Sequence, residues 1–360
     1  MENPTLEFLP KRVMSKYIQH QVLTKPFDDL KYDQFESVIN TQMIKEASVE
    51  QQEFLYVYTE KCIIEPTFGW ALSENFRLIA ESYPYAQFVL NQFKPTITKT
   101  HYFRQKRVQL NKAVLLSENY TNYFHFLNDF VGRLALLDRL NVSRDIPVIV
   151  SEELRSSIFF QQFNMLCPKF FNRNWTFQAK NEYYEIEDAT YFVQNITCKH
   201  ENFRPLLDEL SYEENTVASP DKIFITRRGV YGRGLVNSLE IESIAQNNNF
   251  KIIDAQNFTI AEQVKLFTNA THIIGLHGAG LMNMIYCKNK HVKILELFPG
   301  NFYKAVYYWL ASQFSHSYSC IRGLPTTDNE QTITSTSIIF KSNFYMPPDV
   351  FLNKLMTWLK

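Results

Sequence analysis

The residues best suited to hold a phosphate group lie in one glycine-rich stretch of the chain. Gly275, Gly278 and Gly280 follow a short apolar run and precede a second one over residues 281–286. This order predicts a buried strand, a tight turn and the N-terminus of a helix, where free backbone N–H groups and the helix dipole favour an anion. His277 lies at the tip of the turn, where its imidazole could donate to a phosphate oxygen. The alternative is a turn whose glycines serve packing alone.

The glycine spacing separates this stretch from two other phosphate-binding motifs. The pattern G-x-x-G-x-G reverses the dinucleotide fingerprint G-x-G-x-x-G, which argues against NAD and therefore against a nucleotide-sugar epimerase. The stretch also lacks the Lys and Ser/Thr of a P-loop, which argues against an ATPase. A phosphate bound here would belong to another kind of ligand.

A histidine and an aspartate four residues apart are the best candidates for proton transfer. His125 and Asp129 lie in the segment 122–137, whose apolar residues recur at the three- and four-residue steps of a helix face. Both side chains therefore project from one face and could act as base and orienter for a substrate hydroxyl. Asn122 and Arg133 flank the pair. The alternative is an ordinary surface pair, and the spacing leaves open which of the two would be the base.

Charged side chains follow or occupy two predicted strands in the second half of the chain. Arg227 and Arg228 end one apolar strand pattern, and Glu296 lies in another. Guanidinium groups suit phosphate oxygens, and a carboxylate suits ribose hydroxyls. Together with His277, these residues predict one site for a phosphorylated ligand. The alternatives are structural ion pairs for the arginines and a plain surface carboxylate for Glu296.

The elements that must position these residues alternate between strand and helix. Strand patterns in the first half lie at residues 113–116, 145–150 and 188–193, and those in the second half at 222–226, 250–254, 273–274 and 292–298. The first set suggests a βαβ-type domain. The second set is typical of a parallel, doubly wound sheet, in which ligands bind beyond the carboxyl ends of the strands.

A polar segment over residues 211–220, which ends in Ser-Pro, is the clearest linker in the chain. It predicts an N-terminal domain over residues 1–210 and a C-terminal domain over residues 221–345. An amphipathic pattern at the end of the chain predicts a helix over residues 346–360 that packs back on the N-terminal domain.

The composition is that of an ordinary globular protein, with 45% hydrophobic and 21% charged residues among 360. A net charge of zero argues against nucleic-acid binding through a positive field. Five scattered cysteines without a C-x-x-C pair argue against a disulfide framework and a zinc site. No signal peptide or membrane-spanning run is visible, so we expect a cytoplasmic protein with at most peripheral contact to the inner face of a membrane.

Residues 274–287, followed by the Glu-Leu-Phe-Pro run of residues 296–299, resemble the C-terminal signature of glycosyltransferase family 61. Residues 223–228 resemble its strand-plus-arginine element, and residues 122–129 resemble its Asn-x-x-His-x-x-x-Asp element. The family includes bacterial capsular-polysaccharide enzymes, plant xylan-decorating enzymes and animal O-GlcNAc-type transferases. The similarity extends over residues 113–140 and 222–310.

The resemblance implies an α/β fold of the GT-B type, in which two Rossmann-like domains face each other across a cleft. The C-terminal domain would hold the nucleotide sugar, with Arg228 and His277 on the diphosphate and Glu296 on the ribose. The full set of nucleotide-sugar-binding residues would be Arg227, Arg228, His277, Gly278, Ala279, Gly280, Leu281, Asn283 and Glu296. The N-terminal domain would hold the acceptor, with His125 and Asp129 as catalytic residues and Asn122 and Arg133 on the acceptor side.

The resemblance further implies an inverting, metal-independent transferase that needs no cofactor besides its nucleotide-sugar co-substrate. No Asp-x-Asp triplet that could place a metal is found in a loop, so the arginines and the helix N-terminus would neutralise the leaving group. We expect transfer from a UDP-sugar to a hydroxyl of a glycan or glycolipid, in the synthesis of a surface polysaccharide such as a capsule or lipopolysaccharide. The alternative is a non-catalytic nucleotide- or glycan-binding module on the same fold.

Overall fold

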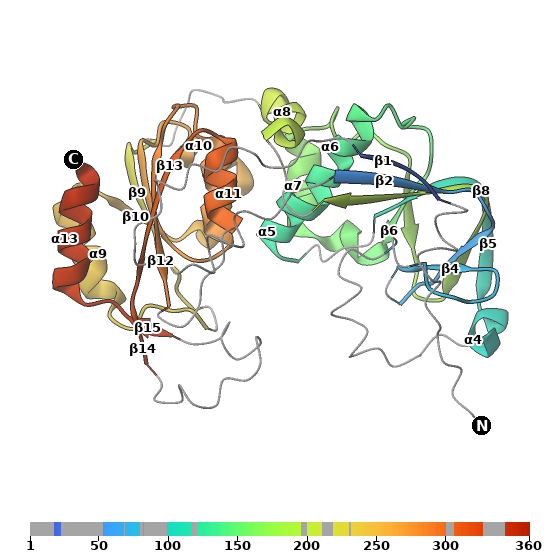
Figure 1. Ribbon diagram of the computed structural model, residues 1–360, viewed down its shortest axis with the longest axis horizontal. Coiled ribbons are helices and arrows are strands. Elements are labelled where there is room, and N and C mark those ends of the chain that lie inside the picture. The colour runs from blue at the N-terminus through green and yellow to red at the C-terminus, as the bar shows by residue number, and fades with distance from the viewer. Residues whose placement is uncertain are drawn as a thin grey trace. The chain divides into compact units, whose positions relative to one another are not determined.

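The structure is a computed structural model that describes residues 18–22, 53–67, 69–79, 82, 99–116, 121–195, 200–210, 219–229, 232–299, 306–326 and 343–360. These residues form two compact units, the first ending at residue 195 and the second beginning at residue 200 (Figure 1). Most of the predicted linker, residues 211–218, lies outside the described residues. Helix α8 (His200–Glu209) belongs to the second unit, whereas the sequence prediction assigns it to the N-terminal domain.

The first unit is built on a mixed sheet. Its strands in the described residues are β1 (Ile18–Val22), β2 (Glu53–Tyr58), β3 (Cys62–Ile64), β4 (Ala71–Ser73), β5 (Lys106–Leu115), β6 (Val148–Ser151), β7 (Trp175–Gln178) and β8 (Glu182–Asn195). They follow the order β1-β2-β8-β5-β6-β7, with β3 paired to β8 and β4 paired to β3. Strands β8, β5, β6 and β7 are mutually parallel, and the remaining pairings are antiparallel.

Helices of the first unit precede β5 or connect the parallel strands β5, β6 and β7. They are α4 (Lys99–Arg104), α5 (Tyr123–His125), the π-helical turn η3 (Phe126–Val131), α6 (Gly132–Arg139), the 3-10 helix η4 (Glu152–Ser156) and α7 (Ile158–Leu166). The predicted helix face packs through aromatic rings, since Phe126 stacks on Phe163 of α7 with ring centroids 5.6 Å apart. This packing holds α5, η3 and α6, the segment that follows β5 in the chain, against α7.

The second unit is a parallel sheet with helices on both faces. Its strands follow the order β10-β9-β11-β12-β13, and every pairing among them is parallel. They are β9 (Lys222–Ile225), β10 (Lys251–Ile253), β11 (His272–Leu276), β12 (Lys293–Phe298) and β13 (Ser317–Arg322), beside a small ribbon of β14 (Leu324–Pro325) and β15 (Phe344–Tyr345). The predicted parallel α/β organisation of this half of the chain is confirmed.

Two helical layers cover this sheet (Figure 1). The helices besides α8 are α9 (Ser238–Asn247), η5 (Ala255–Asn257), α10 (Ile260–Phe267), the 3-10 helix η6 (Ala279–Tyr286), α11 (Val306–Gln313) and α13 (Pro348–Leu359). Because strand side chains alternate between faces, Leu295 and Leu297 join the core beneath α9 and α13. Glu296 lies between them and therefore faces the layer of α10, η6 and α11.

The order in which strands are added to the sheet reverses between β9 and β11. Strand β10 lies on one side of β9, and β11, β12 and β13 follow in order on the other side. Connections on opposite faces leave a crevice at the carboxyl ends of the two central strands, where open α/β sheets bind ligands. Arg227 follows β9 and His277 follows β11, so this topology brings both to the crevice.

The C-terminal helix α13 packs within the second unit. Phe351 and Leu355 are fully buried in one core with Ile241 and Ala245 of α9. The helix therefore covers its own sheet, in contrast to the predicted packing on the N-terminal domain. The sequence pattern indicates an apolar stripe on this helix, but which surface the stripe meets depends on the fold.

No helix in the described part of the chain combines the length and the apolar character needed to cross a bilayer.

Candidate active site

The glycine-rich turn joins β11 to η6, and its three glycines have different roles. A Cβ atom at Gly275 would lie 2.7 Å from Leu281 Cδ2, and one at Gly280 would lie 2.9 Å from Ile225 Cγ2. These two glycines therefore allow the turn to pack closely against side chains of the second unit. A Cβ atom at Gly278 would instead collide with Nη1 of Arg227. The third glycine thus admits a guanidinium group onto the turn.

Arg227 lies against the turn with part of its hydrogen-bonding capacity unused. Its Nη1 donates to the backbone oxygen of His277 at 3.4 Å, and its buried Nε has no hydrogen-bond partner among the described residues. Burial and repulsion from the neighbouring Arg233 lower the pKa of Arg227 to about 10. The Arg227 side chain therefore stays charged at neutral pH. The cations of Arg227 and Arg233 lie near each other at the carboxyl ends of the two central strands.

Arg233 is a site residue that the sequence analysis does not single out. It lies between Gly232 and Gly234, in the loop after β9, with a left-handed φ of 58°. Burial lowers the pKa of Arg233, whereas Tyr307 and Glu296 act in the opposite direction. A non-glycine residue in this conformation is uncommon and concentrates at functional sites. The Gly-Arg-Gly sequence is the signal that could have identified it.

His277 is buried and held by a chain of hydrogen bonds. Its Nδ1 lies 2.5 Å from Oε1 of Glu296, and the Tyr318 hydroxyl donates to Oε2 of the same carboxylate at 2.5 Å. The ring of Phe298 stacks on the imidazole with centroids 5.0 Å apart, and the ring of Tyr307 meets it edge-on. Burial lowers the pKa of His277; Glu296 acts in the opposite direction, and the two arginines lower the pKa further.

Glu296 does not have the geometry of a ribose ligand. Its side chain is fully buried, and His277 and Tyr318 occupy its two oxygens. The predicted contact of Glu296 with a ribose is therefore corrected: this carboxylate orients the His277 ring. It was misassigned because a strand pattern does not reveal that the residue faces the inner helical layer.

Arg228 is held away from the glycine turn by an ion pair. Its Nη2 donates to Oε2 of Glu242 on α9, and the Thr226 hydroxyl donates to Oε1 of Glu242 at 2.5 Å. A structural ion pair of this kind is the predicted alternative to phosphate binding by the arginines. Of the two arginines, Arg227 is therefore the one that lies on the turn itself.

The first residues of η6 differ in what they offer a ligand. Ala279 and Gly280 are half-buried, which leaves the start of the helix accessible. Leu281 and Asn283 are fully buried, and the Asn283 amide donates to Gln263 Oε1 of α10 at 2.9 Å. The side chains of Leu281 and Asn283 therefore anchor the turn, in contrast to their predicted role as nucleotide ligands.

In the first unit, Asn122 starts the helix that holds the catalytic candidates. Its Oδ1 accepts from the backbone N–H groups of Phe124 at 2.9 Å and His125 at 3.3 Å. An Asn at this position satisfies backbone donors that the helix leaves unpaired. Asn122 was predicted on the acceptor side, and the contacts described here are those of a helix cap.

His125 and Asp129 form a pair with unequal exposure. Nδ1 of His125 lies 2.6 Å from Oδ2 of Asp129, and the Asn128 amide donates to Oδ1 at 2.7 Å. The Asp129 side chain is 1% exposed, whereas the His125 side chain is 40% exposed. The carboxylate is therefore held between two donors, and the imidazole is the member of the pair that a large substrate can reach.

Asp129 lies in a π-helical turn. The Gly132 backbone N–H reaches the Leu127 oxygen, five residues back, between the α-helical segments α5 and α6. Such turns are rare and occur mostly as single bulges, frequently at functional sites. Arg133, predicted on the acceptor side, is buried one turn further along.

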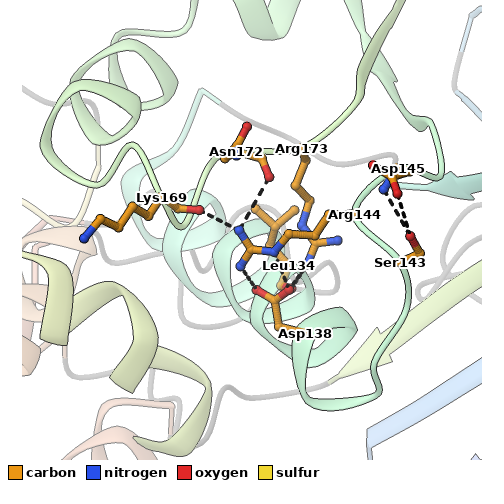
Figure 2. Close-up of polar contacts among 8 residues, drawn as sticks. All are labelled: Leu134, Asp138, Ser143, Arg144, Asp145, Lys169, Asn172 and Arg173. Atoms are coloured by element: carbon orange, nitrogen blue, oxygen red, sulfur yellow. Dashed lines mark hydrogen bonds and ion pairs between the residues drawn. The ribbon is translucent and has the colours of Figure 1, made fainter.

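The far end of this helix is anchored by a charged cluster (Figure 2). Asp138 accepts from Arg173 Nη2 at 2.6 Å and from Arg144 Nη2 at 2.8 Å. Arg144 also donates to the backbone oxygen of Lys169 at 2.6 Å, and Arg173 donates to that of Leu134 at 3.3 Å. The cluster joins α6 to the loop before β7 and so fixes the helix that holds His125.

Among the residues that the structure describes, no three His, Cys, Asp or Glu side chains are grouped so that they could hold a metal ion. The candidate site residues that the fold gathers lie in two groups. The second unit gathers Arg227, Arg233 and His277 at one turn, and the first unit gathers His125 and Asp129 on one helix.

A family model described as Glycosyltransferase 61 matches residues 123–294. The match begins at the first residue of α5 and ends within β12, so it includes His125, Asp129, Arg227, Arg233 and His277. No curated protein matches the chain significantly.

Proposed function

We propose that the protein is a glycosyltransferase that uses a nucleoside-diphosphate sugar as its donor, because the Glycosyltransferase 61 family model matches residues 123–294. The observation that carries this choice is the pair Arg227 and Arg233 at the glycine turn. Two guanidinium groups that repel each other in a partly buried site are stabilised by an anion of matching charge. A diphosphate has that charge, and the accessible start of η6 adds backbone donors.

The same groups support a metal-independent reaction. Negative charge develops on the diphosphate as the bond to the sugar breaks, and preorganised cations stabilise such charge. Arg227 and Arg233 lie together at the glycine turn, so they could fulfil the role that a divalent ion has in other transferases. Arg227 replaces Arg228 as the principal phosphate ligand in this proposal.

Acceptor activation is assigned to His125. An inverting transfer requires one base, which removes the proton from the acceptor hydroxyl as that hydroxyl attacks the sugar opposite the leaving nucleotide. His125 is exposed and is oriented by the buried Asp129, which matches the arrangement of a base and its orienter. A GT-B arrangement, in which the two units close around both substrates, is part of this proposal.

The substrates and the cellular setting extend the proposal on family grounds. We infer a UDP-sugar as donor and a glycan or glycolipid hydroxyl as acceptor, in surface polysaccharide synthesis at the inner face of a membrane. The glycan acceptor follows from the family, whereas the uridine base and the pathway rest on the resemblance alone.

Thermal stabilisation by a panel of UDP-, GDP-, ADP- and dTDP-sugars tests the donor site. A ligand at ~100 times its dissociation constant should add ~2.7 kcal/mol to the stability of the unit that binds it. Arg227→Gln should weaken the best donor about tenfold or more, since a charge-assisted hydrogen bond contributes roughly 1.5–3 kcal/mol. The matched variant Arg228→Gln should weaken it less.

Turnover distinguishes an enzyme from a binding module. Nucleotide release from the best donor should rise when a cell-envelope acceptor extract is added, and it should persist in the presence of a chelator. Binding without any release would favour the non-catalytic alternative, and loss of activity on chelation would refute the metal-independent mechanism.

A further inference from the structure

We propose that a pocket in the first unit binds an uncharged sugar unit of the acceptor glycan, at a distance from the sugar whose hydroxyl reacts. The pocket has a volume of about 570 Å³ and lies where β6 ends at Ser151 and β7 ends at Gln178. Its walls are the 3-10 helix η4 and the turn over residues 179–181 that leads into β8. The inference rests on the proposed function, in which the first unit holds the acceptor.

The pocket lies at the same edge of the sheet as the helix that holds His125. Strand β5 runs parallel to β6, and β6 to β7, so their carboxyl ends share the edge where open α/β sheets bind ligands. The ring of Tyr123, two residues before His125, meets the ring of Phe159 with centroids 5.3 Å apart. Phe159 follows Ser156 of the pocket wall by three residues, a chain length of at most about 11 Å. The pocket and His125 are therefore within the reach of one short oligosaccharide.

The pocket lining carries no net charge. The carboxylates of Glu152 and Glu153 are balanced by Arg155 and Lys180, and Nζ of Lys180 pairs with Oε1 of Glu153 at 2.8 Å. Balanced charges give little attraction to a phosphate or to an acidic sugar. They do place hydrogen-bond donors and acceptors side by side, and a sugar hydroxyl both donates and accepts. An uncharged sugar is therefore the ligand that matches this lining.

Hydrogen bonds order the η4 wall of the pocket before a ligand binds. Oγ of Ser151 accepts from the backbone N–H of Glu153 at 3.2 Å, and the Ser156 hydroxyl donates to the backbone oxygen of Glu153 at 2.9 Å. The Gln161 amide donates to the backbone oxygen of Arg155 at 2.8 Å. A wall that is ordered in advance loses less conformational entropy when it binds its ligand.

Arg155 is the lining residue whose side chain is best positioned by a contact outside the pocket. Its guanidinium group lies over the ring of Phe177 on β7, 4.2 Å from the ring centroid. A cation–π contact of this kind restrains a guanidinium group without using its N–H groups as hydrogen-bond donors to a partner. Arg155 is also exposed and lines the pocket, so a sugar hydroxyl can accept from it.

Saturation-transfer NMR tests the pocket without turnover. The full chain would be mixed with neutral oligosaccharides from the cell-envelope extract, separated from the acidic ones by anion exchange. The wild-type protein should bind the neutral fraction. Ala179→Phe places a ring in the pocket and should remove most of this binding, and Arg155→Ala should weaken it about tenfold, the effect of one lost charge-assisted hydrogen bond. Arg104→Ala is the matched control, because Arg104 is an exposed arginine that ends α4, before the amino end of β5.

Acceptor kinetics distinguish a binding subsite from a structural support of the catalytic residues. In Arg155→Ala the KM for long neutral oligosaccharides should rise about tenfold with kcat unchanged, because contacts with a distant sugar are equally strong in the ground state and the transition state. Acceptors too short to reach the pocket should be used equally well by the variant and the wild type. Melting temperature and donor affinity should also be unchanged.

The outcomes separate this inference from the function on which it rests. Absence of neutral-oligosaccharide binding by the wild-type protein, or a preference for the acidic fraction, would overturn the inference. Equal losses with short and long acceptors would also overturn it, since Arg155 would then support the fold. Neutral-oligosaccharide binding that Ala179→Phe removes, without transfer from any nucleotide sugar, would refute the proposed function and uphold the pocket as a glycan site.

Discussion

At the scale of single residues, burial divides the roles of His125 and Asp129. The two side chains share one hydrogen bond, but only the imidazole is substantially exposed. A buried carboxylate with both oxygens occupied can hold a histidine tautomer and stabilise the imidazolium that forms during proton transfer. The sequence left the choice of base open, and we now assign it to His125.

This assignment predicts that the pair affects the chemical step more than donor binding. His125→Ala should lower turnover ~10²–10⁴-fold, the usual contribution of a general base, with donor affinity nearly unchanged. Asp129→Asn should lower turnover as well. The double variant should be little worse than the worse single one, because residues that act as a unit are non-additive. Steady-state transfer rates and calorimetric donor affinities provide the test; near-normal transfer in both single variants would reject this helix as the catalytic element.

A second prediction at this scale uses the different roles of the glycines. Gly278→Ala places a methyl group against Nη1 of Arg227 and should displace the guanidinium group, which would weaken donor binding about tenfold without unfolding the unit. Gly275→Ala drives its methyl group into Leu281 and should cost about 1–3 kcal/mol of stability instead. Melting temperatures and donor affinities of both variants would be compared. Equal effects of the two variants on binding would argue against a specific contact at Gly278.

At the scale of elements, the helix that holds His125 and Asp129 is fixed at both ends by different means. Asn122 caps its first turn, and the Asp138 cluster joins its last turn to the loop before β7 (Figure 2). The π-helical turn lies between these two anchors, and its residues Asn128 and Asp129 are buried. Anchors at both ends limit the freedom of this turn to change into a regular α-helix.

The Asp138 cluster allows a matched comparison of a buried and an exposed ion pair. The Arg173 side chain is 0% exposed and that of Arg144 is 43% exposed, although both bond to the same carboxylate. Asp138→Asn leaves a buried cation without its counter-ion and should cost about 3 kcal/mol. Arg144→Gln should cost less than about 1 kcal/mol. Denaturant unfolding of the first unit measures both; similar small losses would show that the cluster does not anchor the helix.

At the scale of the whole molecule, a buried histidine makes the stability of the second unit depend on pH. His316 lies in the second unit with its Nε2 3.2 Å from the Met284 oxygen of η6. Burial lowers its pKa to about 4, which is well below the ordinary value of about 6.5. The folded state therefore binds fewer protons than the unfolded state between these two values, and the second unit should lose stability as the pH falls through that window.

The expected pH dependence can be assigned to His316 by substitution. Each pH unit between about 6.5 and about 4 should remove up to ~1.4 kcal/mol from the stability of the second unit. His316→Gln keeps an amide donor for the Met284 oxygen and removes the titrating ring, so its unfolding should depend less on pH across this window. Thermal unfolding of the full chain at pH 7 and pH 5 provides the comparison, and an unchanged pH slope in the variant would remove His316 from this account.

Sequence alone determined the features that depend on near neighbours in the chain. The capping box of Thr259 and Glu262 forms at the start of α10, and it needs only their three-residue spacing. His125 and Asp129 meet because they are four apart on one helix. The strand, turn and helix around the three glycines follow from local apolar runs and from the conformations that glycine allows, although η6 is a 3-10 helix. Such contacts form whenever their element forms, so the pattern is sufficient.

Only the tertiary structure decided which distant groups meet. Glu296 bonds to Tyr318, Arg228 pairs with Glu242, Asn283 bonds to Gln263, and Arg227 has Arg233 for a neighbour. Each of these contacts depends on strand order, on register or on which face of the sheet a residue occupies. A periodic pattern gives the face only relative to its own element, and it does not give the order of the strands. For that reason the sequence predicted an anion site at the glycine turn but could not show which distant side chains lie beside that turn.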